Sequence, residues 1–428
     1  MLDFLGYALL VALIGLLWAY LTRTTAIRRV IPLAGTDEHT LDARGERFNL
    51  YLGLLTGTQI VGDNRIDVLF NGDSTFPRLW EALKGAEHAI CVHVFEFHPG
   101  ELADELLRIL SERAQAGVKV LLLLDAVGGK RVTRDYRQRL IAAGASVATY
   151  RPLRFGNFYK YQQRMHMRAV IVDGRIGFTG GFGIADEWQG DGRSAGQWRD
   201  TNVRVEGAAA MQLQVAFSSN WAEATGDLLV GDAITPFTEL PPPKTPQAAG
   251  IMACSPSLGA TTAERFFFLA ITSARERIYI ASAYFVPSRD LRWLLMNAAD
   301  RGVDVRILIP GVNTDQPMVW HAGRAIYGWL MDAGVRIFEY QPAMMHAKTF
   351  VSDGCWATVG TFNLDNRSMK LNDEVALIIR DEEIARCLDA QFLDDLKHAR
   401  ELHPADLAAA SHLDWAKIRF SRLLTPLL

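Results

Sequence analysis

The fold of this chain is indicated most sharply by the stretch His346-Ala347-Lys348-Thr349-Phe350-Val351-Ser352-Asp353. Alternate residues of a β-strand lie on one face, so the spacing predicts that His346 and Lys348 project side by side, while Asp353 falls in the turn that follows. An imidazole beside an ammonium group suits a phosphate ester, because one group can attack or protonate the ester and the other neutralises oxyanion charge. The stretch therefore predicts a site for chemistry on a phosphate ester.

A second copy of this pattern lies in the first half of the chain. It reads His166-Met167-Arg168 and continues to Asp173 and Gly180-Gly181-Phe182-Gly183, whereas the later copy continues to Gly360-Thr361-Phe362-Asn363. Gly180 follows His166 by 14 positions, and Gly360 follows His346 by the same 14. Two copies at corresponding places indicate a duplicated chain.

Around the motifs, apolar runs of strand length alternate with amphipathic segments of helix length, which is typical of an α/β protein. In the first half we expect a strand over residues 89–97, a helix over 102–116 and a strand over 118–124. In the second half we expect a strand over 278–286, a helix over 289–300 and a strand over 303–309. The two halves thus repeat one order of elements.

The N-terminal segment reads as a membrane anchor. Residues 4–21 carry no charge for 18 positions, which is just enough helix to cross a hydrocarbon core of roughly 30 Å. Arg23, Arg28 and Arg29 follow the segment and only Asp3 precedes it, so we expect the body of the protein on the cytoplasmic side. A cleaved signal peptide is the alternative.

Five prolines between positions 236 and 246 predict a stiff connection between the halves. The expected organisation is a transmembrane anchor (1–22), a juxtamembrane segment (23–60), a first half (61–235), a linker (236–249), a second half (250–400) and a C-terminal amphipathic segment (401–428). The last of these suits either a membrane interface or packing on the protein's own body.

Composition excludes several classes of protein. Lys and Arg number 45 against 48 Asp and Glu, a net charge of −3, so no overall basic field exists to hold nucleic acid. Four widely spaced cysteines indicate neither a zinc site nor a disulfide scaffold, and a reducing compartment fits best.

The pattern His-x-Lys-x-x-x-x-Asp followed by Gly-(Gly/Ser/Thr)-x-Asn resembles the phospholipase D superfamily. Four further segments are similar to bacterial cardiolipin synthases: Trp198 to Thr201, Tyr284 to Pro287, Glu339 to Pro342 and Asn363 to Ser368. The resemblance covers residues 60 to 400 or so. It implies two homologous α/β halves, each a mixed sheet flanked by helices, related by a pseudo-two-fold axis with one site between them.

The resemblance also implies a phosphatidyl transfer that needs neither metal nor cofactor. The family pattern implies that His166 is the nucleophile, which forms a phosphohistidine, and that His346 is the acid and base. Asp200 lies 34 residues after His166 and Glu374 lies 28 after His346, where the family has the carboxylates that orient these histidines. The family pattern assigns phosphate binding to Arg168, Lys348 and Asn363, and structural roles to Asp173, Asp353, Gly180, Gly181, Gly360 and Thr361.

The partners that follow from the resemblance are phospholipids, with phosphatidylglycerol first, and a membrane, but no nucleic acid. The expected location is a bacterial inner membrane, with a single span. A phospholipase D that transfers the phosphatidyl group to water is the alternative, since the same residues serve both reactions. Oligomeric state is left open.

Two residues depart from the family pattern. Arg168 stands where the family has lysine, and Gly183 stands where it has asparagine. We expect His166 to remain catalytic with Arg168 supplying the positive charge, because a guanidinium also clamps phosphate. The competing hypothesis is a degenerate first half, in a homologue that binds lipid without full catalysis.

A segment without acidic residues precedes and includes the first motif. Residues 137–171 contain no Asp or Glu but hold seven basic residues and several aromatic ones. This composition suits a loop resting on anionic lipid, or else a solvated basic face with its rings tucked underneath. Farther on, Asp186, Glu187 and residues 190–196 are expected to form a surface excursion that leads to Trp198.

Overall fold

The computed structural model describes residues 41–152, 162–234, 245–256 and 261–408, with a few isolated positions nearer the N-terminus. Most of the expected anchor (4–21) lies outside the described residues, as do most of the linker (236–249) and of the C-terminal segment (401–428). Within the described part of the chain, no helix is both long enough and apolar enough to span a membrane.

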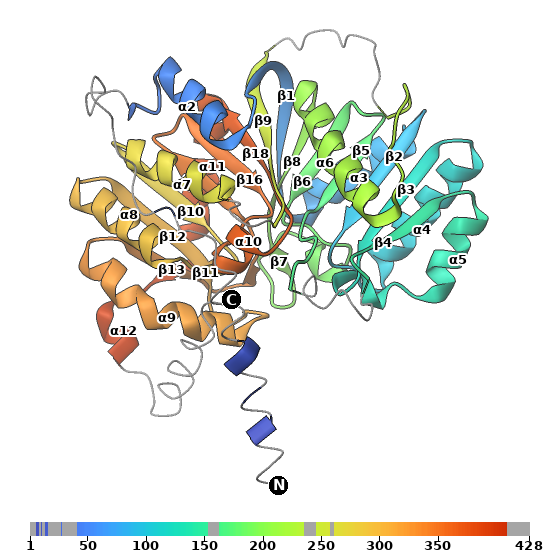
Figure 1. Ribbon diagram of the computed structural model, residues 1–428. Helices are drawn as coiled ribbons and strands as arrows, with labels where there is room; N and C mark the ends of the chain where they lie inside the picture. The colour runs from blue at the N-terminus through green and yellow to red at the C-terminus, as the bar shows by residue number, and fades with distance from the viewer. Residues whose placement is uncertain are drawn as a thin grey trace.

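One mixed sheet of fifteen strands runs through the described part of the molecule (Figure 1). The first half contributes β1 (Val61–Phe70), β2 (Ala89–Val94), β3 (Lys119–Asp125), β4 (Ser146–Tyr150), β5 (Ala169–Val172), β6 (Ile176–Gly180) and β8 (Thr201–Glu206). The second half contributes β9 (Gln247–Cys254), β10 (Arg277–Ala281), β12 (Asp304–Pro310), β13 (Arg336–Tyr340), β15 (Thr349–Ser352), β16 (Trp356–Gly360), β18 (Glu374–Arg380) and the edge strand β19 (Ala399–Glu401).

The strand order shows the duplication. The order β4-β3-β2-β5-β6-β8-β1 in the first half corresponds to β13-β12-β10-β15-β16-β18-β9 in the second, and the halves join where β1 pairs with β9. The pairs β2–β3 and β10–β12 are both parallel, whereas β2–β5 and β10–β15 are both antiparallel. The expected mixed α/β architecture is therefore present, as one continuous sheet.

Helices lie along the sheet in both halves (Figure 1). The first half and the segment before it contain α2 (Glu46–Thr56), α3 (Asn71–Lys84), α4 (Glu101–Gln115), α5 (Arg134–Ala142) and α6 (Ala208–Thr225). The second half contains α7 (Thr262–Ser273), α8 (Arg289–Asp300), α9 (Pro317–Asp332), α10 (Asn366–Lys370), α11 (Glu382–Leu396) and α12 (Pro404–Ala408). All six residues of β2 are buried, as expected for a central strand with helices on both faces.

The predicted elements agree with this arrangement except for two strands. The strand expected over 89–97 ends at Val94. The strand expected over 278–286 is divided into β10 and β11 (Phe285–Val286). At the division the Ser282 hydroxyl donates to the carbonyl of Tyr284, and the chain then leaves the large sheet to pair with β17 (Leu364–Asp365). In addition, β9 begins at Gln247, so the last residues of the expected linker already belong to the sheet.

Several residues of the acid-free segment face protein instead of lipid. Arg151 contacts Glu223 and Asp373, each at 2.8 Å, and its side chain is 7% exposed. Tyr150 is fully buried. These carboxylates neutralise Arg151, and Asp373 ties the end of β4 to the second half. The lipid-facing interpretation is therefore wrong for Tyr150 and Arg151. Residues 153–161 of the segment lie outside the described residues.

Candidate active site

The second-half pair has the geometry that strand spacing predicts. His346 and Lys348 lie between β14 (Met344–Met345) and β15. Both are buried, and the Lys348 Nζ lies 2.8 Å from the His346 Nε2. Because the ammonium donates toward Nε2, the imidazole proton belongs on Nδ1.

The His166–Arg168 pair of the first half has the same arrangement as the His346–Lys348 pair, although arginine replaces lysine. His166 and Arg168 are buried, and the Arg168 Nη1 lies 3.1 Å from the His166 Nε2. The guanidinium also sits over the ring of Phe95, 5.5 Å from its centroid. Arg168 thus places a cation beside His166 as Lys348 does beside His346.

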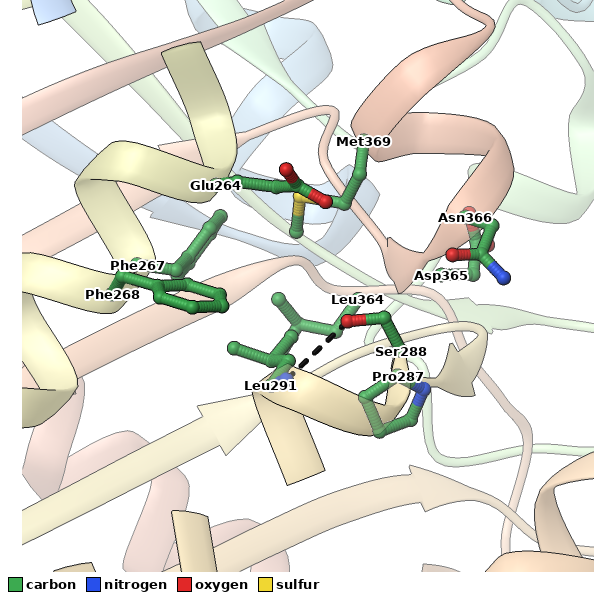
Figure 2. Close-up of a pocket in the computed structure, with 10 residues that line it drawn as sticks. All are labelled: Glu264, Phe267, Phe268, Pro287, Ser288, Leu291, Leu364, Asp365, Asn366 and Met369. Carbon is green, nitrogen blue, oxygen red and sulfur yellow. Dashed lines mark hydrogen bonds between the residues drawn. The ribbon is translucent and has the colours of Figure 1, made fainter. Parts of the chain in front are cut away.

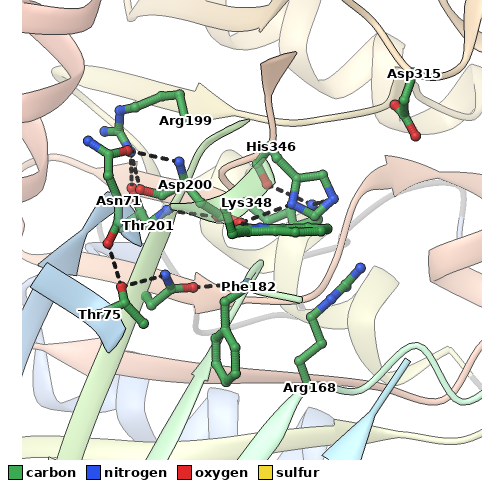
Figure 3. A network of polar contacts seen from close by, with 12 residues as sticks. Asn71, Thr75, Arg168, Phe182, Arg199, Asp200, Thr201, Asp315, His346 and Lys348 are labelled. Carbon is green, nitrogen blue, oxygen red and sulfur yellow. Dashed lines mark hydrogen bonds and ion pairs between the residues drawn. The ribbon is translucent and has the colours of Figure 1, made fainter. Parts of the chain in front are cut away.

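The two orienting carboxylates cross between the halves. The Nδ1 of His166 lies 2.9 and 3.0 Å from the two carboxylate oxygens of Glu374. The Nδ1 of His346 lies 3.0 Å from the Oδ2 of Asp200 (Figure 3). Each histidine therefore forms its dyad with an acid from the other half, and neither half contains a complete site.

Backbone contacts hold the crossed dyads in place. The short strand β7 (Trp198–Arg199) runs parallel to β14, and the amide of His346 donates to the carbonyl of Arg199 at 2.7 Å. The Arg199 guanidinium in turn contacts Asp395 at 2.7 Å, with both side chains buried. On the other side, Asp373 donates its amide to the carbonyl of Arg164 at 2.8 Å.

Each carboxylate receives further hydrogen bonds. The hydroxyl of Thr361 donates to Glu374, and Asn372 Nδ2 lies 3.2 Å from the Oε1 of Glu374. Asp200 accepts the amide of Thr201 at 2.8 Å and the indole N–H of Trp188 at 2.8 Å. These donors stabilise the charges of Glu374 and Asp200, which are both fully buried.

The motif aspartates and glycines occupy structural positions. Asp173 and Asp353 adopt left-handed backbone angles, with φ of 51° and 50°. Each accepts three backbone amides from the start of a neighbouring strand, residues 87–89 for the first and 275–277 for the second. A Cβ at Gly360 would lie 2.3 Å from a carbonyl oxygen of β18. These residues shape the turns and strand contacts behind the site.

The last residue of the glycine segment differs between the halves: it is Gly183 in the first and Asn363 in the second. Asn363 is buried, and its Oδ1 has no hydrogen-bond partner among the described residues, so it is free to contact a ligand. At Gly183 an added Cβ would lie 2.8 Å from the Trp188 ring. The tryptophan occupies the space that a side chain at position 183 would need.

The electrostatic balance of the site favours an anion. Burial, followed by the charges of Arg168 and Lys348, holds the pKa of His166 well below its usual value, and burial followed by Lys348 does the same for His346. Burial lowers the pKa of Lys348 to about 7. It raises the pKa of Glu374 to about 7 and raises that of Asp200 as well. A bound phosphate would relieve the repulsion among these cationic groups.

A separate small pocket lies beside the second motif (Figure 2). Its lining includes Phe267, Phe268, Leu291, Leu364 and Met369. The cavity is about 10 Å³, the room that a single water molecule needs. It is too small for an acyl chain, so it does not compete with the histidine pair as the reaction site.

The segment expected as a surface excursion, Asp186, Glu187 and residues 190–196, is mostly exposed or half-buried, but it flanks a buried tryptophan that the sequence did not single out. Trp188 is 1% exposed, and its ring lies 5.2 Å from the ring of His346, edge to face. Trp198 packs on the same imidazole at 4.7 Å. Asp186 accepts the first amides of α4 and so caps that helix. The glycine at position 183 was the sequence signal that could have revealed the tryptophan.

Family comparison agrees with the motifs. A family model described as "Cardiolipin synthase, PLD-like domain" matches residues 79–221 and 268–396. A probable cardiolipin synthase of Bacillus subtilis is 32% identical over 94% of this chain and 80% of its own length. A cardiolipin synthase of Geobacillus kaustophilus is 35% identical over 84% of this chain and 72% of its own.

Solved structures show the same fold at low sequence identity. Phosphatidylserine synthase of Haemophilus influenzae superimposes with a TM-score of 0.67 at 14% identity, covering 90% of this chain and 100% of that one. Polyphosphate kinase of Porphyromonas gingivalis superimposes with a TM-score of 0.54 at 10% identity, over 83% of this chain and 52% of that one.

Proposed function

The chain belongs to the cardiolipin synthase family of phospholipase D-like proteins, and from this premise we propose that it transfers a phosphatidyl group between phospholipids through a phosphohistidine. As a member it is a phosphatidyltransferase of the phospholipase D superfamily. We further propose the covalent intermediate, the role of each residue, the lipid substrates and the membrane anchor.

In the first step, the Nε2 of His166 attacks the phosphorus of a phospholipid. The new N–P bond replaces the P–O bond to the headgroup alcohol, and His346 gives its Nε2 proton to the leaving oxygen. His346 needs to be protonated for this role, although burial and Lys348 disfavour its charge in the empty site. The phosphate anion that binds beside the two cations supplies the compensating charge.

In the second step, His346 takes the proton from the hydroxyl of an acceptor lipid. The acceptor oxygen attacks the phosphorus, and the N–P bond to His166 breaks, which restores both histidines. Glu374 stabilises the positive charge on the phosphorylated ring of His166, and Asp200 does the same for His346. Water as the acceptor would give phosphatidic acid instead of a diphosphatidyl lipid.

The observation that carries this proposal is the equivalence of the two histidine–cation pairs. Arg168 lies 3.1 Å from His166, and Lys348 lies 2.8 Å from His346. Each imidazole also has a buried carboxylate on its opposite nitrogen. An intact dyad in the first half favours a working site over a degenerate one, despite the arginine.

The membrane setting is part of the same proposal. We assign residues 4–21 as the anchor, with the body on the cytoplasmic face of a bacterial inner membrane. Phosphatidylglycerol is the proposed donor and acceptor, and the two halves face each other across an approximate two-fold axis. The repeated strand order of the halves supports this symmetry.

The test is to incubate the purified full-length protein in phosphatidylglycerol vesicles and to identify the products by mass spectrometry. Cardiolipin formation that is lost in His346→Ala and His166→Ala supports transfer through the paired site. Phosphatidic acid without cardiolipin would assign the protein as a hydrolase. Activity that persists in His166→Ala would contradict the phosphohistidine on that residue.

A further inference from the structure

The two dyads obtain their supporting hydrogen bonds from different residues. In the second half, the hydroxyl of Thr361, the residue after the motif glycine, donates to the orienting acid Glu374. The corresponding residue in the first half is Gly181, which has no side chain. A Cβ there would lie 2.3 Å from the Oδ1 of Asp200, so a larger residue at 181 would require the Asp200 carboxylate to move.

Trp188 supplies the missing donor in the first half. Its indole Nε1 lies 2.8 Å from the Oδ2 of Asp200. The same oxygen accepts from the Nδ1 of His346 at 3.0 Å. The Trp188 ring also meets the His346 ring edge to face, with an interplanar angle of 88°. One side chain therefore contacts both members of the dyad.

Gly183 makes room for this arrangement. A Cβ at position 183 would lie 2.8 Å from both Cη2 and Cζ3 of Trp188, closer than carbon atoms approach without displacement. Trp188 is 1% exposed, and the centroid of the Trp198 ring lies 4.1 Å from its own. The indole and a larger residue at 183 therefore exclude each other.

We propose that Trp188 is a positioning residue that holds Asp200 and His346 in their reactive geometry, and that the glycine at 183 exists to admit it. In the first half, Gly183 lacks the phosphate-binding side chain of the family pattern, and the Trp188 indole instead supports the Asp200–His346 pair. This inference rests on the proposed function, in which His346 is the proton donor and acceptor.

The Trp188 indole affects the charges of Asp200 and His346. The groups that face His346 are Asp200, Lys348, Arg168 and His166. The indole N–H stabilises the charge of Asp200 and so makes this carboxylate a weaker base. Loss of that hydrogen bond leaves a more basic Asp200, which holds the imidazolium form of His346 more strongly.

Trp188→Phe is the first test, because phenylalanine keeps an aromatic ring but lacks the indole N–H. We expect the imidazole nitrogens of His346, followed by ¹⁵N NMR and assigned with His346→Ala, to titrate at higher pH than in the natural protein. The part of the pH–rate profile that reports the titration of His346 should also shift to higher pH. Turnover should fall by about tenfold or more, as when the supporting partner of a reactive group is lost.

Trp221→Phe is the matched control. Trp221 lies on α6, where it stacks on Phe217, so the same substitution there should move neither the titration nor the pH profile. If Trp188→Phe lowers thermal stability but leaves the His346 titration and the pH profile unchanged, Trp188 is only a packing residue and the proposal is overturned.

Gly183→Asn tests the exclusion between the two side chains. We expect it to reduce turnover by displacing the indole, and we expect Gly183→Asn/Trp188→Phe to be more active than Gly183→Asn alone. The phenyl ring lacks the outer indole carbons with which residue 183 collides, so the second change relieves the first. Full activity of Gly183→Asn would overturn the proposed exclusion.

The two readouts separate this inference from the proposed function. If the natural protein makes neither cardiolipin nor phosphatidic acid, the proposed function fails. The NMR titration needs no turnover, and it still determines whether Trp188 controls the protonation of His346.

Discussion

Glu374 and His166 come from opposite halves of the chain, 208 positions apart, yet the carboxylate lies 2.9 Å from the imidazole Nδ1. Asp200 and His346 form the reciprocal pair. Each motif histidine thus obtains its carboxylate partner from the other half, so neither half contains a complete histidine–carboxylate pair.

Glu374→Gln should abolish most of the activity without unfolding the protein. The neutral amide is isosteric but cannot stabilise the positive charge that develops on the His166 ring. We expect turnover of phosphatidylglycerol to fall by about 10³–10⁴-fold. The control is Glu401→Gln, which removes a surface pair with Arg336 and should leave turnover unchanged. A loss of less than tenfold would show that Glu374 does not orient a reactive histidine.

Arg168→Lys should preserve or raise transferase activity, because it restores a compact cation beside His166. Arg168→Ala should lose about 10²–10³-fold, the usual effect of removing one donor to a developing oxyanion. Liposome assays of both variants provide the measurement. Arg139→Lys, on the exposed face of α5, is the neutral control. An inactive natural protein together with an inactive Arg168→Lys would support a degenerate first half.

Anion binding should draw protons into the site near neutral pH. Lys348 and Glu374 both have a pKa of about 7 in the empty site, and a nearby anion raises both values. We expect these two groups to take up about 0.5–1 proton at pH 7.5, and their share should fall toward zero near pH 5.5, where both are already protonated. Uptake that persists at pH 5.5 is assigned to His346, whose pKa is held low in the empty site.

Calorimetry in buffers of different ionisation enthalpy measures this uptake. The ligand is a short-chain phosphonate analogue of phosphatidylglycerol, which carries one negative charge and lacks the scissile ester bond. Lys348→Met should reduce the uptake. Proton release on binding would contradict the prediction that the anion raises the pKa of Lys348 and of Glu374.

Gly360→Ala should destabilise the fold at the second motif. The new methyl group would lie 2.3 Å from the carbonyl oxygen of Val375 on the adjacent strand, so one of the two backbones has to move. We expect a loss of about 1–3 kcal/mol in the free energy of unfolding, measured by urea denaturation.

Gly53→Ala is the control for that experiment. At position 53, inside α2, the nearest atom to an added Cβ is 3.6 Å away. The substitution should be neutral or stabilising by up to about 1 kcal/mol, because alanine favours the helix. Equal stability of the two variants would contradict the close strand contact at Gly360.

The elements that depend on local pattern were predicted well. Helix α8 has the bounds that periodicity predicted, and Leu102, Leu106 and Leu110 form a buried stripe on α4. The side-by-side placement of His346 and Lys348 also followed from spacing. These features were predictable because the period of a strand or helix is fixed by its own backbone.

Features that depend on distant partners were not predicted. The crossing of the carboxylates depends on the pairing of β7 with β14 and on the contact of Asp373 with Arg164, which no local period encodes. The burial of Arg151 depends on Glu223 and Asp373, so a segment rich in basic residues did not indicate an exposed surface at this position.

The sequence by itself determined the duplication, the family and the residue types of the site, because motif spacing and helix and strand periods are properties of the chain. Only the tertiary structure decided which acid serves which histidine and that Trp188 fills the space beside Gly183. Those relations are set by strand pairing and close packing between segments far apart in sequence, where the space left by one side chain fixes what another can do.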